Sequence, residues 1–167
     1  MLIFTMIGQE YTLEEISYSR KEDRRVMESV LKFWFADPKT LNFVSPDFKY
    51  PFDFISWIKL YNKNQKSNIT TIVLKHNDWI VGHVSIEIEK EISEIFHLFL
   101  DKEHRKKGLS IRILEEIEKY GKESGTKFVQ ASIQKKDTIC HKLFTKSGYK
   151  NQSLRNSKST TMIKSLR

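Results

Sequence analysis

Four titratable side chains, His104, Arg105, Lys106 and Lys107, stand directly before Gly108 and an amphipathic segment. The first turn of a helix already carries partial positive charge and N–H groups without an acceptor. A basic cluster at this end repels itself, so the arrangement predicts a bound anion. A glycine loop that opens a helix provides such a site, because successive backbone N–H groups form a concave nest and the helix dipole adds to their field.

Two common nucleotide-binding motifs do not fit this loop. The phosphate loop of nucleoside triphosphatases requires G-x-x-x-x-G-K-[ST], and no glycine lies five residues before Gly108. The dinucleotide-binding fingerprint requires three glycines in G-x-G-x-x-G, and this stretch has only one. The predicted anion site therefore belongs to neither class.

The positive charge of the chain is concentrated in its second half. The net charge is +8; residues 102–167 hold 17 Lys and Arg against 6 Asp and Glu, whereas residues 1–101 hold 12 against 15. A basic half suggests a phosphorylated partner, and the mildly acidic half could face a cationic one. For most of these lysines, a solvated surface explains the charge equally well.

Length and composition predict one domain, residues 1–167, with a core that folds without disulfides. Apolar residues make up 39% of the chain, and no apolar run reaches the ~18–20 residues of a membrane-spanning helix. The N-terminal segment lacks the basic leader and cleavage site of a secretory signal. The single cysteine, Cys140, fits a reducing cytoplasm, and no Cys or His pair has zinc-site spacing. We expect a cytoplasmic protein without a metal.

The periodicity of apolar residues predicts a mixed α/β fold with strand–helix–strand crossovers in its second half. Helical spacing occurs within residues 20–35, 52–62, 109–121 and 137–148, and a loop is expected over 37–51. Strands are expected over 11–19, as a three-strand meander within 68–101, over 127–133, and as a hairpin after 148. In the meander, Val84, Ile86 and Ile88 alternate with polar residues, which indicates a strand exposed on one face.

The glycine loop resembles the coenzyme A signature of the GNAT N-acetyltransferase superfamily. That signature reads Arg or Gln, two residues, Gly, one residue, then Gly or Ala, and here Arg105-Lys106-Lys107-Gly108-Leu109-Ser110 ends in a small substitute. A second motif, "LFTKSGY" (143–149), is similar to the family's "FYEKLGF"-like stretch, with Phe144 where the family often has Tyr. The two motifs stand in the family's order, and the resemblance covers residues 68–149.

The resemblance implies a GNAT-like α/β fold, with a mixed, mostly antiparallel sheet, flanking helices, and splayed fourth and fifth strands. It also implies acetyl-CoA as co-substrate. The pyrophosphate would lie on backbone N–H groups of residues 105–110, whose basic side chains would neutralise it, and the pantetheine would pair with the backbone of the fourth strand. The implied cofactor-binding residues are Leu98, Leu100, Arg105, Lys106, Lys107, Gly108, Leu109, Ser110, Asp137 and Phe144.

Glu94 is the candidate general base. It stands eleven residues before the signature, where the histone-acetylating branch of the family has a carboxylate. Alternation predicts that it shares a strand face with Phe96, Leu98 and Leu100, and apolar neighbours raise the pKa of a carboxylate toward the range of a working base. The alternative is a solvated glutamate at a strand start. His97 is expected on the opposite face as a hydrogen-bonded core histidine.

Phe144 cannot donate a proton, so the family's tyrosine acid is missing. Coenzyme A can still leave as a thiolate, because a thiol has a pKa near ~8.5. Tyr120 and Tyr149 are alternative donors, although Tyr149 is expected to pack after its turn. The oxyanion is expected to accept a hydrogen bond from a backbone N–H of the fourth strand, that of Leu98.

Three functions stay open. The first is an acetyl-CoA-dependent N-acetyltransferase acting on a primary amine of a protein or small molecule, and the second is a GNAT-fold protein that binds acyl-CoA with weak catalysis. The third, a basic nucleic-acid-binding module, is not expected, because the basic segment 153–167 has no aromatic residue.

The acceptor and the oligomeric state, monomer or homodimer, stay open as well. Residues 52–62 with the following strands are similar to the Rim-type branch, which acetylates ribosomal-protein N-termini, but also to antibiotic and polyamine branches. Neutralising an α-amine at pH 7 costs ~1 kcal/mol, against about 4.6 kcal/mol for a lysine-type amine. The α-amine is therefore the less demanding substrate for a site without a tyrosine acid.

Overall fold

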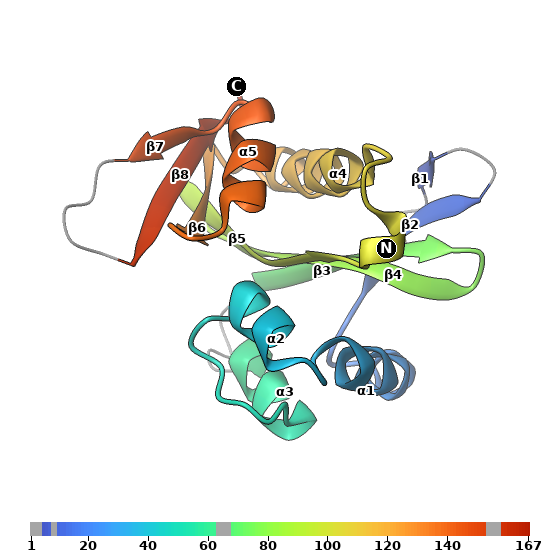
Figure 1. The fold of residues 1–167 in the computed structure, drawn as a ribbon. Coiled ribbons are helices and arrows are strands. Elements are labelled where there is room, and N and C mark those ends of the chain that lie inside the picture. The colour runs from blue at the N-terminus through green and yellow to red at the C-terminus, as the bar shows by residue number, and fades with distance from the viewer. Residues whose placement is uncertain (1–4, 8–9, 63–67, 153–157) are drawn as a thin grey trace.

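The described residues form one eight-stranded mixed sheet with helices on both faces (Figure 1). The computed structural model describes residues 5–7, 10–62, 68–152 and 158–167. The strand order is β1-β2-β3-β4-β5-β6-β8-β7, and each neighbouring pair is antiparallel except β5–β6. The strands are β1 (Thr5–Ile7), β2 (Tyr11–Ile16), β3 (Asn68–His76), β4 (Trp79–Ile88), β5 (Ile92–Leu100), β6 (Phe128–Gln134), β7 (Lys150–Gln152) and β8 (Ser159–Ser165).

The helices form two layers, with the sheet between them (Figure 1). One layer, below the sheet in this view, holds α1 (Lys21–Trp34), α2 (Pro38–Val44) and α3 (Phe54–Asn62). The other holds α4 (Leu109–Glu123) and α5 (Thr138–Lys146), and the short 3₁₀-helix η1 (Lys102–His104) leads from β5 toward α4. No helix within the described ranges is long and apolar enough to cross a membrane.

Each layer of helices has its own apolar core. On the upper face, Ile113, Leu114 and Ile117 of α4 are fully buried against the sheet, as their helical spacing predicts. On the lower face, Trp57 of α3 and Leu31 of α1 are equally buried. Burying one such side chain contributes ~1.5–3 kcal/mol, so both faces of the sheet are held by helices.

The predicted fold class is confirmed, but β1, α2 and η1 are not among the predicted elements. The sequence predicts a loop over 37–51, but α2 occupies the start of this segment. Asp37 caps the helix by accepting from the backbone N–H groups of Lys39 and Thr40 at 3.3 and 3.0 Å, and Pro38 stands in the first turn, where its missing N–H costs nothing. The Asp-Pro pair that signals a loop therefore starts a helix here.

The expectation that β4 is exposed on one face is wrong. Ser85 and His83 are as buried as the apolar residues between and after them. The lower helices cover the face on which these polar side chains lie, and each side chain finds hydrogen-bond partners there. Polar alternation in this strand marks a buried polar network instead of a solvated surface.

The parallel pair in the centre of the sheet separates soon after it begins. Only Ile92–Glu94 of β5 pair with Phe128–Gln130 of β6, and within the described residues the two strands pair no further. The predicted splay is therefore present. It leaves one edge of β5 without a neighbouring strand from Ile95 to Leu100.

Candidate functional site

The loop before α4 contains two residues in the left-handed conformation from which anion-binding nests are built. Lys106 and Gly108 have φ angles of +62° and +75°, a left-handed conformation that turns successive N–H groups toward one side. Gly108 is the N-cap of α4, and no described side chain caps the helix there. The N–H groups of the first turn therefore stay available to a ligand, at the positive end of the helix dipole.

The backbone conformation at position 108 favours a glycine, and the surface of the loop is open there. A Cβ atom built on this residue meets no described atom within 4 Å. Packing within the protein therefore gives no reason for a glycine, whereas the positive φ does. The open surface at the positive end of α4 also lets a phosphate approach the backbone closely.

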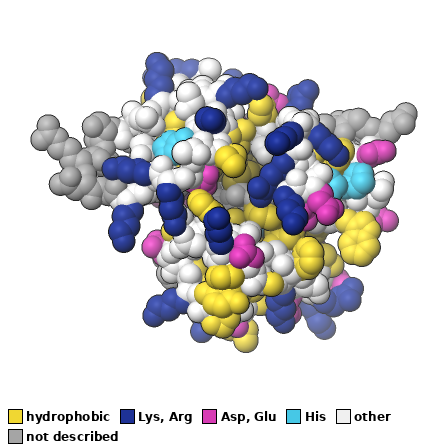
Figure 2. All heavy atoms as spheres, viewed as in Figure 1, with side chains coloured by type: hydrophobic (Ala, Val, Ile, Leu, Met, Phe, Trp, Pro, Cys, Tyr) yellow, Lys and Arg dark blue, Asp and Glu magenta, His cyan; other side chains and the backbone are white. Residues whose placement is uncertain are grey.

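The basic side chains around the loop differ in their surroundings. The Nε atom of Arg105 donates to the carbonyl of Leu100 at 2.9 Å, so this side chain folds back onto the end of β5. The Nζ atom of Lys107 lies 3.4 Å from the Tyr11 hydroxyl, whereas Lys106 is exposed. Figure 2 shows Lys and Arg side chains gathered over the layer of α4 and α5. All three residues are exposed, and the Arg105 side chain is held against the end of β5.

A β-bulge at His97 changes which side chains of β5 share a face. His97 has a φ of +52°, and the pairing of β4 with β5 shifts register opposite it, between His83 and Ser85. Leu98 and Leu100 consequently lie in the upper core, whereas Phe96 and Phe99 lie in the lower core.

The prediction that Glu94 shares a face with Leu98 and Leu100 is therefore wrong. Glu94 and Phe96 point to the lower face by strict alternation. The extra residue at the bulge then moves both leucines to the upper face. His97 is hydrogen-bonded as expected, but it lies among the lower-face residues together with its neighbour Phe96.

The backbone of β5 beyond the bulge faces the splay. The N–H of Asp101 donates to Val81 of β4 at 2.8 Å, so alternate residues direct their polar groups to the other edge of β5. The carbonyl of Leu100 points there, because the Arg105 side chain reaches it from that side. By the same alternation, the N–H and C=O of Leu98 also face the gap between β5 and β6.

A buried histidine holds the bulge in place. The Nδ1–H of His83 donates to the carbonyl of His97 at 2.8 Å, and Nε2 accepts from the Tyr18 hydroxyl at 2.9 Å. A carbonyl can only accept, which fixes the tautomer of His83. Burial lowers the pKa of His83 to about 4, although the hydrogen bond to His97 opposes the shift. A neutral His83 thus pins the carbonyl of the one residue of β5 with positive φ.

The His97 side chain adds a second support to the bulge. Its Nδ1 is 2.9 Å from the Tyr61 hydroxyl and its Nε2 is 3.1 Å from Ser45 Oγ, while its ring stacks on Trp57 at 4.2 Å. Burial, with a smaller contribution from nearby His83, lowers the pKa of His97 well below its ordinary value. A neutral, doubly hydrogen-bonded ring is a structural element here.

Glu94 lies at the point where the two strands begin to separate. It pairs with Gln130 of β6 on one side and faces Glu87 of β4 on the other. Its residue surface is exposed, yet desolvation of the carboxylate raises its pKa. Glu87 and Glu89 act in the same direction through like charge, and a hydrogen bond with Gln130 opposes them. The shift favours proton uptake by Glu94, as the role of a general base requires.

The residues of α5 are structural in this conformation. Asp137 caps the helix by accepting from the N–H of Cys140 at 3.0 Å, and Phe144 is buried against the Tyr149 ring at 4.7 Å. The Tyr149 hydroxyl donates to Glu118 at 2.8 Å, and burial raises its pKa. Tyr149 therefore packs after its turn, as expected, and its proton is engaged by Glu118.

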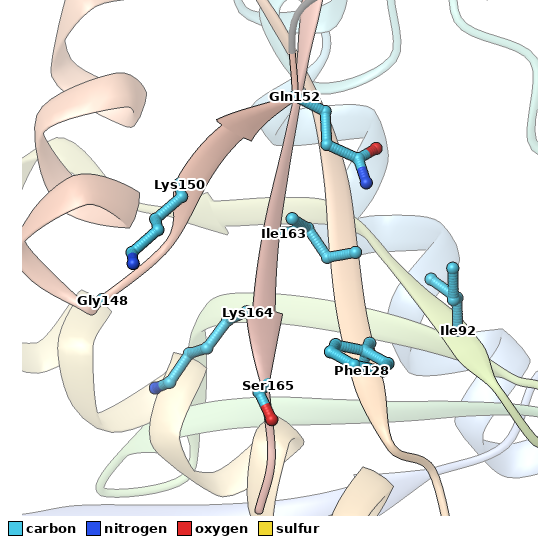
Figure 3. A pocket seen from close by; sticks show the side chains of 8 residues that line it. All are labelled: Ile92, Phe128, Gly148, Lys150, Gln152, Ile163, Lys164 and Ser165. Carbon is cyan, nitrogen blue, oxygen red and sulfur yellow. The ribbon is translucent and has the colours of Figure 1, made fainter.

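A shallow groove of about 680 Å³ lies beside the splay, over β5, β6, β8 and β7. Figure 3 shows Ile92, Phe128 and Ile163 pointing to one side of these strands and Lys164 to the other, while Lys150 of β7 is the cross-strand partner of Ile163. Ile92 and Phe128 lie two residues before Glu94 and Gln130, on the same face of their strands. Ile92 and Phe128 in the groove therefore lie on the same face as Glu94, on the part of the lower face opposite α4 and α5.

Sequence reasoning did not identify two parts of this site. His83 carries no motif and is visible only through its contact with the bulge. The α2 helix lies against β5, where Ser45 reaches His97. Its capping signal, Asp37 followed by Pro38, was present in the sequence and could have indicated the helix.

Comparisons with known proteins agree with this geometry. Residues 28–149 match the family model described as "Acetyltransferase (GNAT) family", whereas none of the curated proteins matches the sequence. The GNAT domain of PAT from S. lividans aligns with a TM-score of 0.77 at 12% identity, over 98% of this chain and 96% of that one.

Two further solved structures have the same fold. One is spermidine N-acetyltransferase from Vibrio cholerae, in complex with CoA and spermine (TM-score 0.71, 15% identity, 95% of this chain and 97% of that one). The other is PaiA N-acetyltransferase from Thermoplasma acidophilum, in complex with coenzyme A (0.66, 16%, 92% and 98%). At such identities these structures share the fold alone, but the family model spans most of the sequence. The chain belongs to the GNAT acetyltransferase family.

Proposed function

We propose that this protein transfers an acetyl group from acetyl-CoA to a primary amine, with Glu94 as the general base. One observation carries the proposal: the open nest at Gly108 and the unpaired edge of β5 lie at successive points of one path, joined by η1. The nest fits a pyrophosphate, and the edge fits an extended amide chain that pairs like a strand. The combination fits coenzyme A along its length.

Different groups of residues would bind the different parts of coenzyme A. Backbone N–H groups of residues 105–110 would hold the pyrophosphate, with Lys106 and Lys107 supplying charge. The C=O of Leu98 and the N–H of Leu100 would pair with the pantetheine arm. Asp137 and Phe144 would act indirectly, by fixing the start and the packing of α5 beside that arm.

The bulge and Glu94 would carry out the transfer. Bound acetyl-CoA supplies a thioester carbonyl, and the N–H of Leu98 would donate to its oxygen as negative charge develops there. Glu94 would take a proton from the amine, so that the nitrogen lone pair can form the new C–N bond while the C–S bond breaks. The thiol group is acidic enough to leave as thiolate. His83 would keep the Leu98 N–H in place through the His97 carbonyl.

The acceptor is an amine that reaches Glu94 from the lower face. The groove at Ile92, Phe128 and Ile163 provides apolar surface beside it, and Glu87 and Glu89 give this approach negative charge. These features support a cationic amine with an apolar portion. A peptide N-terminus and a small amine both meet this description.

A GNAT-fold protein that binds acyl-CoA with weak catalysis is the second candidate. Phe144 favours it, because this residue is buried and cannot protonate the departing thiolate. The two candidates differ in turnover alone, since both require the cofactor site.

A screen of amines for coenzyme A release tests the proposal. The purified protein would be mixed with acetyl-CoA and single amines or peptides, and the free thiol and the product mass would be measured together. We expect release that depends on both protein and amine, with the acetyl group found on the amine. Binding of acetyl-CoA without acetylated product from any amine would favour the second candidate, and thermal stabilisation by oligonucleotide alone would contradict both.

A further inference from the structure

The α2 helix bridges the two strands that separate at the splay. Its C-cap residue Ser45 is 3.1 Å from His97 Nε2 on β5. The carbonyl of Asn42, within the helix, accepts from Gln134 Nε2 at the end of β6, at 2.6 Å. One short helix therefore contacts both walls of the gap on the lower face of the sheet.

A second contact strengthens the attachment to β6. The Nζ atom of Lys136 donates to Asn42 Oδ1 at 3.0 Å and lies 5.3 Å from the centre of the Phe43 ring. Lys136 thus combines a hydrogen bond with a cation–π contact on the same helix. We call these four residues, Asn42, Phe43, Gln134 and Lys136, the α2 clasp.

The clasp bounds the gap between β5 and β6 on the face where Glu94 lies. At one end the opening is closed by the last paired residues of the strands, Glu94 and Gln130. At the other end it is closed by the clasp at Gln134, four residues further along β6. Four residues of strand span ~13 Å at ~3.3 Å each, and the side chains of Gln130 and Ser132 occupy part of this length.

On the basis of the proposed function, we propose that the α2 clasp selects amines whose nitrogen is attached to an unbranched carbon. Such an amine can enter end-on between the paired strands and the clasp. A substituent on the carbon next to nitrogen has to fit beside the nitrogen, where the walls are closest to the reacting atoms. Because the clasp ties both walls together, the opening cannot widen without breaking the contacts of Gln134 and Lys136.

Two classes of amine have their nitrogen attached to an unbranched carbon. One is a free alkyl amine, and the other is a peptide that begins with glycine. Butylamine and sec-butylamine form a pair with similar amine basicity, as do two peptides that differ only in a first residue of Gly or Val. Within each pair the protonation cost is nearly equal, so the ratio of kcat/KM values reports shape alone.

The decisive experiment compares these ratios in the parent and in Gln134→Ala/Lys136→Ala, which opens the clasp. Lys135→Ala is the matched control, since Lys135 is the exposed neighbour of both residues and has no part in the clasp. Lys136→Arg is the conservative variant, because arginine can keep both the hydrogen bond and the ring contact. Acetyl-CoA affinity is measured for each protein by calorimetry.

We expect the parent to favour the unbranched member of each pair that it acetylates, and the open-clasp variant to lower this preference ~10-fold at unchanged acetyl-CoA affinity. Lys135→Ala and Lys136→Arg should keep the parent's preference. If the ratio of kcat/KM values in the open-clasp variant stays within about threefold of the parent's ratio, or if Lys135→Ala changes it equally, the proposed selectivity of the clasp is wrong. The proposed function stands in either case. A parent that binds acetyl-CoA but acetylates neither series overturns the proposed function itself, and the clasp with it.

Discussion

At the scale of single residues, Glu94 and His83 have opposite electrostatic tasks. Glu94 sits where like charge and desolvation favour the protonated form, so it can accept a proton and release it again. His83 is held neutral by burial, so it can donate steadily to the His97 carbonyl. One residue is suited to exchange a proton during the reaction, and the other is suited to keep its proton throughout.

Replacing Glu94 with glutamine should slow the reaction and leave binding intact. A positioned general base contributes ~10²–10⁴-fold in rate, so kcat of Glu94→Gln should fall by such a factor while acetyl-CoA affinity stays unchanged. The loss should shrink at high pH, where more of the amine is neutral without help. Rates are compared from pH 6 to 9.5, with Glu123→Gln, an exposed carboxylate at the end of α4, as the control. A Glu94→Gln rate within about threefold of the parent across this range would remove Glu94 from the mechanism.

The neutral state of His83 should make the fold sensitive to acid. The pKa of His83 is about 4 in the folded protein, whereas an unfolded histidine has a pKa of ~6.5. Between these values the unfolded chain binds more protons, so the free energy of unfolding falls as the pH is lowered. For His83 alone the loss amounts to about 3 kcal/mol between pH ~7 and ~4.

Urea unfolding at several pH values measures this loss. In His83→Asn the amide can still donate to the His97 carbonyl but does not titrate. This variant should be less stable than the parent at pH 7, yet lose less of its stability on acidification. Parallel pH dependences for the two proteins would show that His83 is not the source of the acid sensitivity.

At the scale of elements, the strand β5 explains how a small irregularity builds the site. The single extra residue at His97 directs the side chains of Leu98 and Leu100 upward and leaves their backbone facing the splay. The loop from η1 to α4 then carries the chain from the end of this edge to the nest at Gly108. Strand edge and nest are thus neighbours in sequence and can act on one extended ligand.

The basic loop should act on the nucleotide part of the ligand through charge. Changing Lys106 and Lys107 together to Ala should weaken coenzyme A binding at least ~10-fold, and this loss should diminish as salt is raised. A pantetheine fragment without the nucleotide should bind the variant as it binds the parent. Lys119→Ala/Lys122→Ala, on the exposed surface of α4, provides a control with the same change in net charge. An equal loss for both ligands would contradict a role in phosphate binding.

At the scale of the whole molecule, periodicity predicted most of the sheet and its helices. The two motifs at Gly108 and at 143–149 stand in family order, and the resemblance that they support implies the fold class and the splay. Apolar periodicity, helix caps and short motifs each depend on residues that are close together in the sequence, so they can be recognised without the structure. Asp137 is an example: it begins the segment 137–148 in which helical spacing occurs, and it caps the helix that forms there.

What the sequence did not reveal depends on contacts between distant segments. Whether Ser85 faces solvent is decided by α3, whose Tyr61 hydroxyl lies 2.9 Å from it. The face of Leu98 is decided by a bulge that alternation cannot anticipate, because one residue of positive φ reverses the pattern. The C-terminal part of α2 contacts β5 and β6, which lie far away in the sequence, so no local pattern indicates these contacts.

Calorimetry of acetyl-CoA binding to two glycine variants tests the central claim that the Gly108 loop holds the cofactor. Gly108→Val and Gly125→Val both place a side chain at a positive φ, and at both positions a Cβ meets no described atom within 4 Å. Their backbone strain should therefore be similar, at ~1–2 kcal/mol each. Gly108→Val should lose acetyl-CoA affinity by ~100-fold or more, whereas Gly125→Val should bind like the parent. Equal affinities for the two folded variants would contradict the claim.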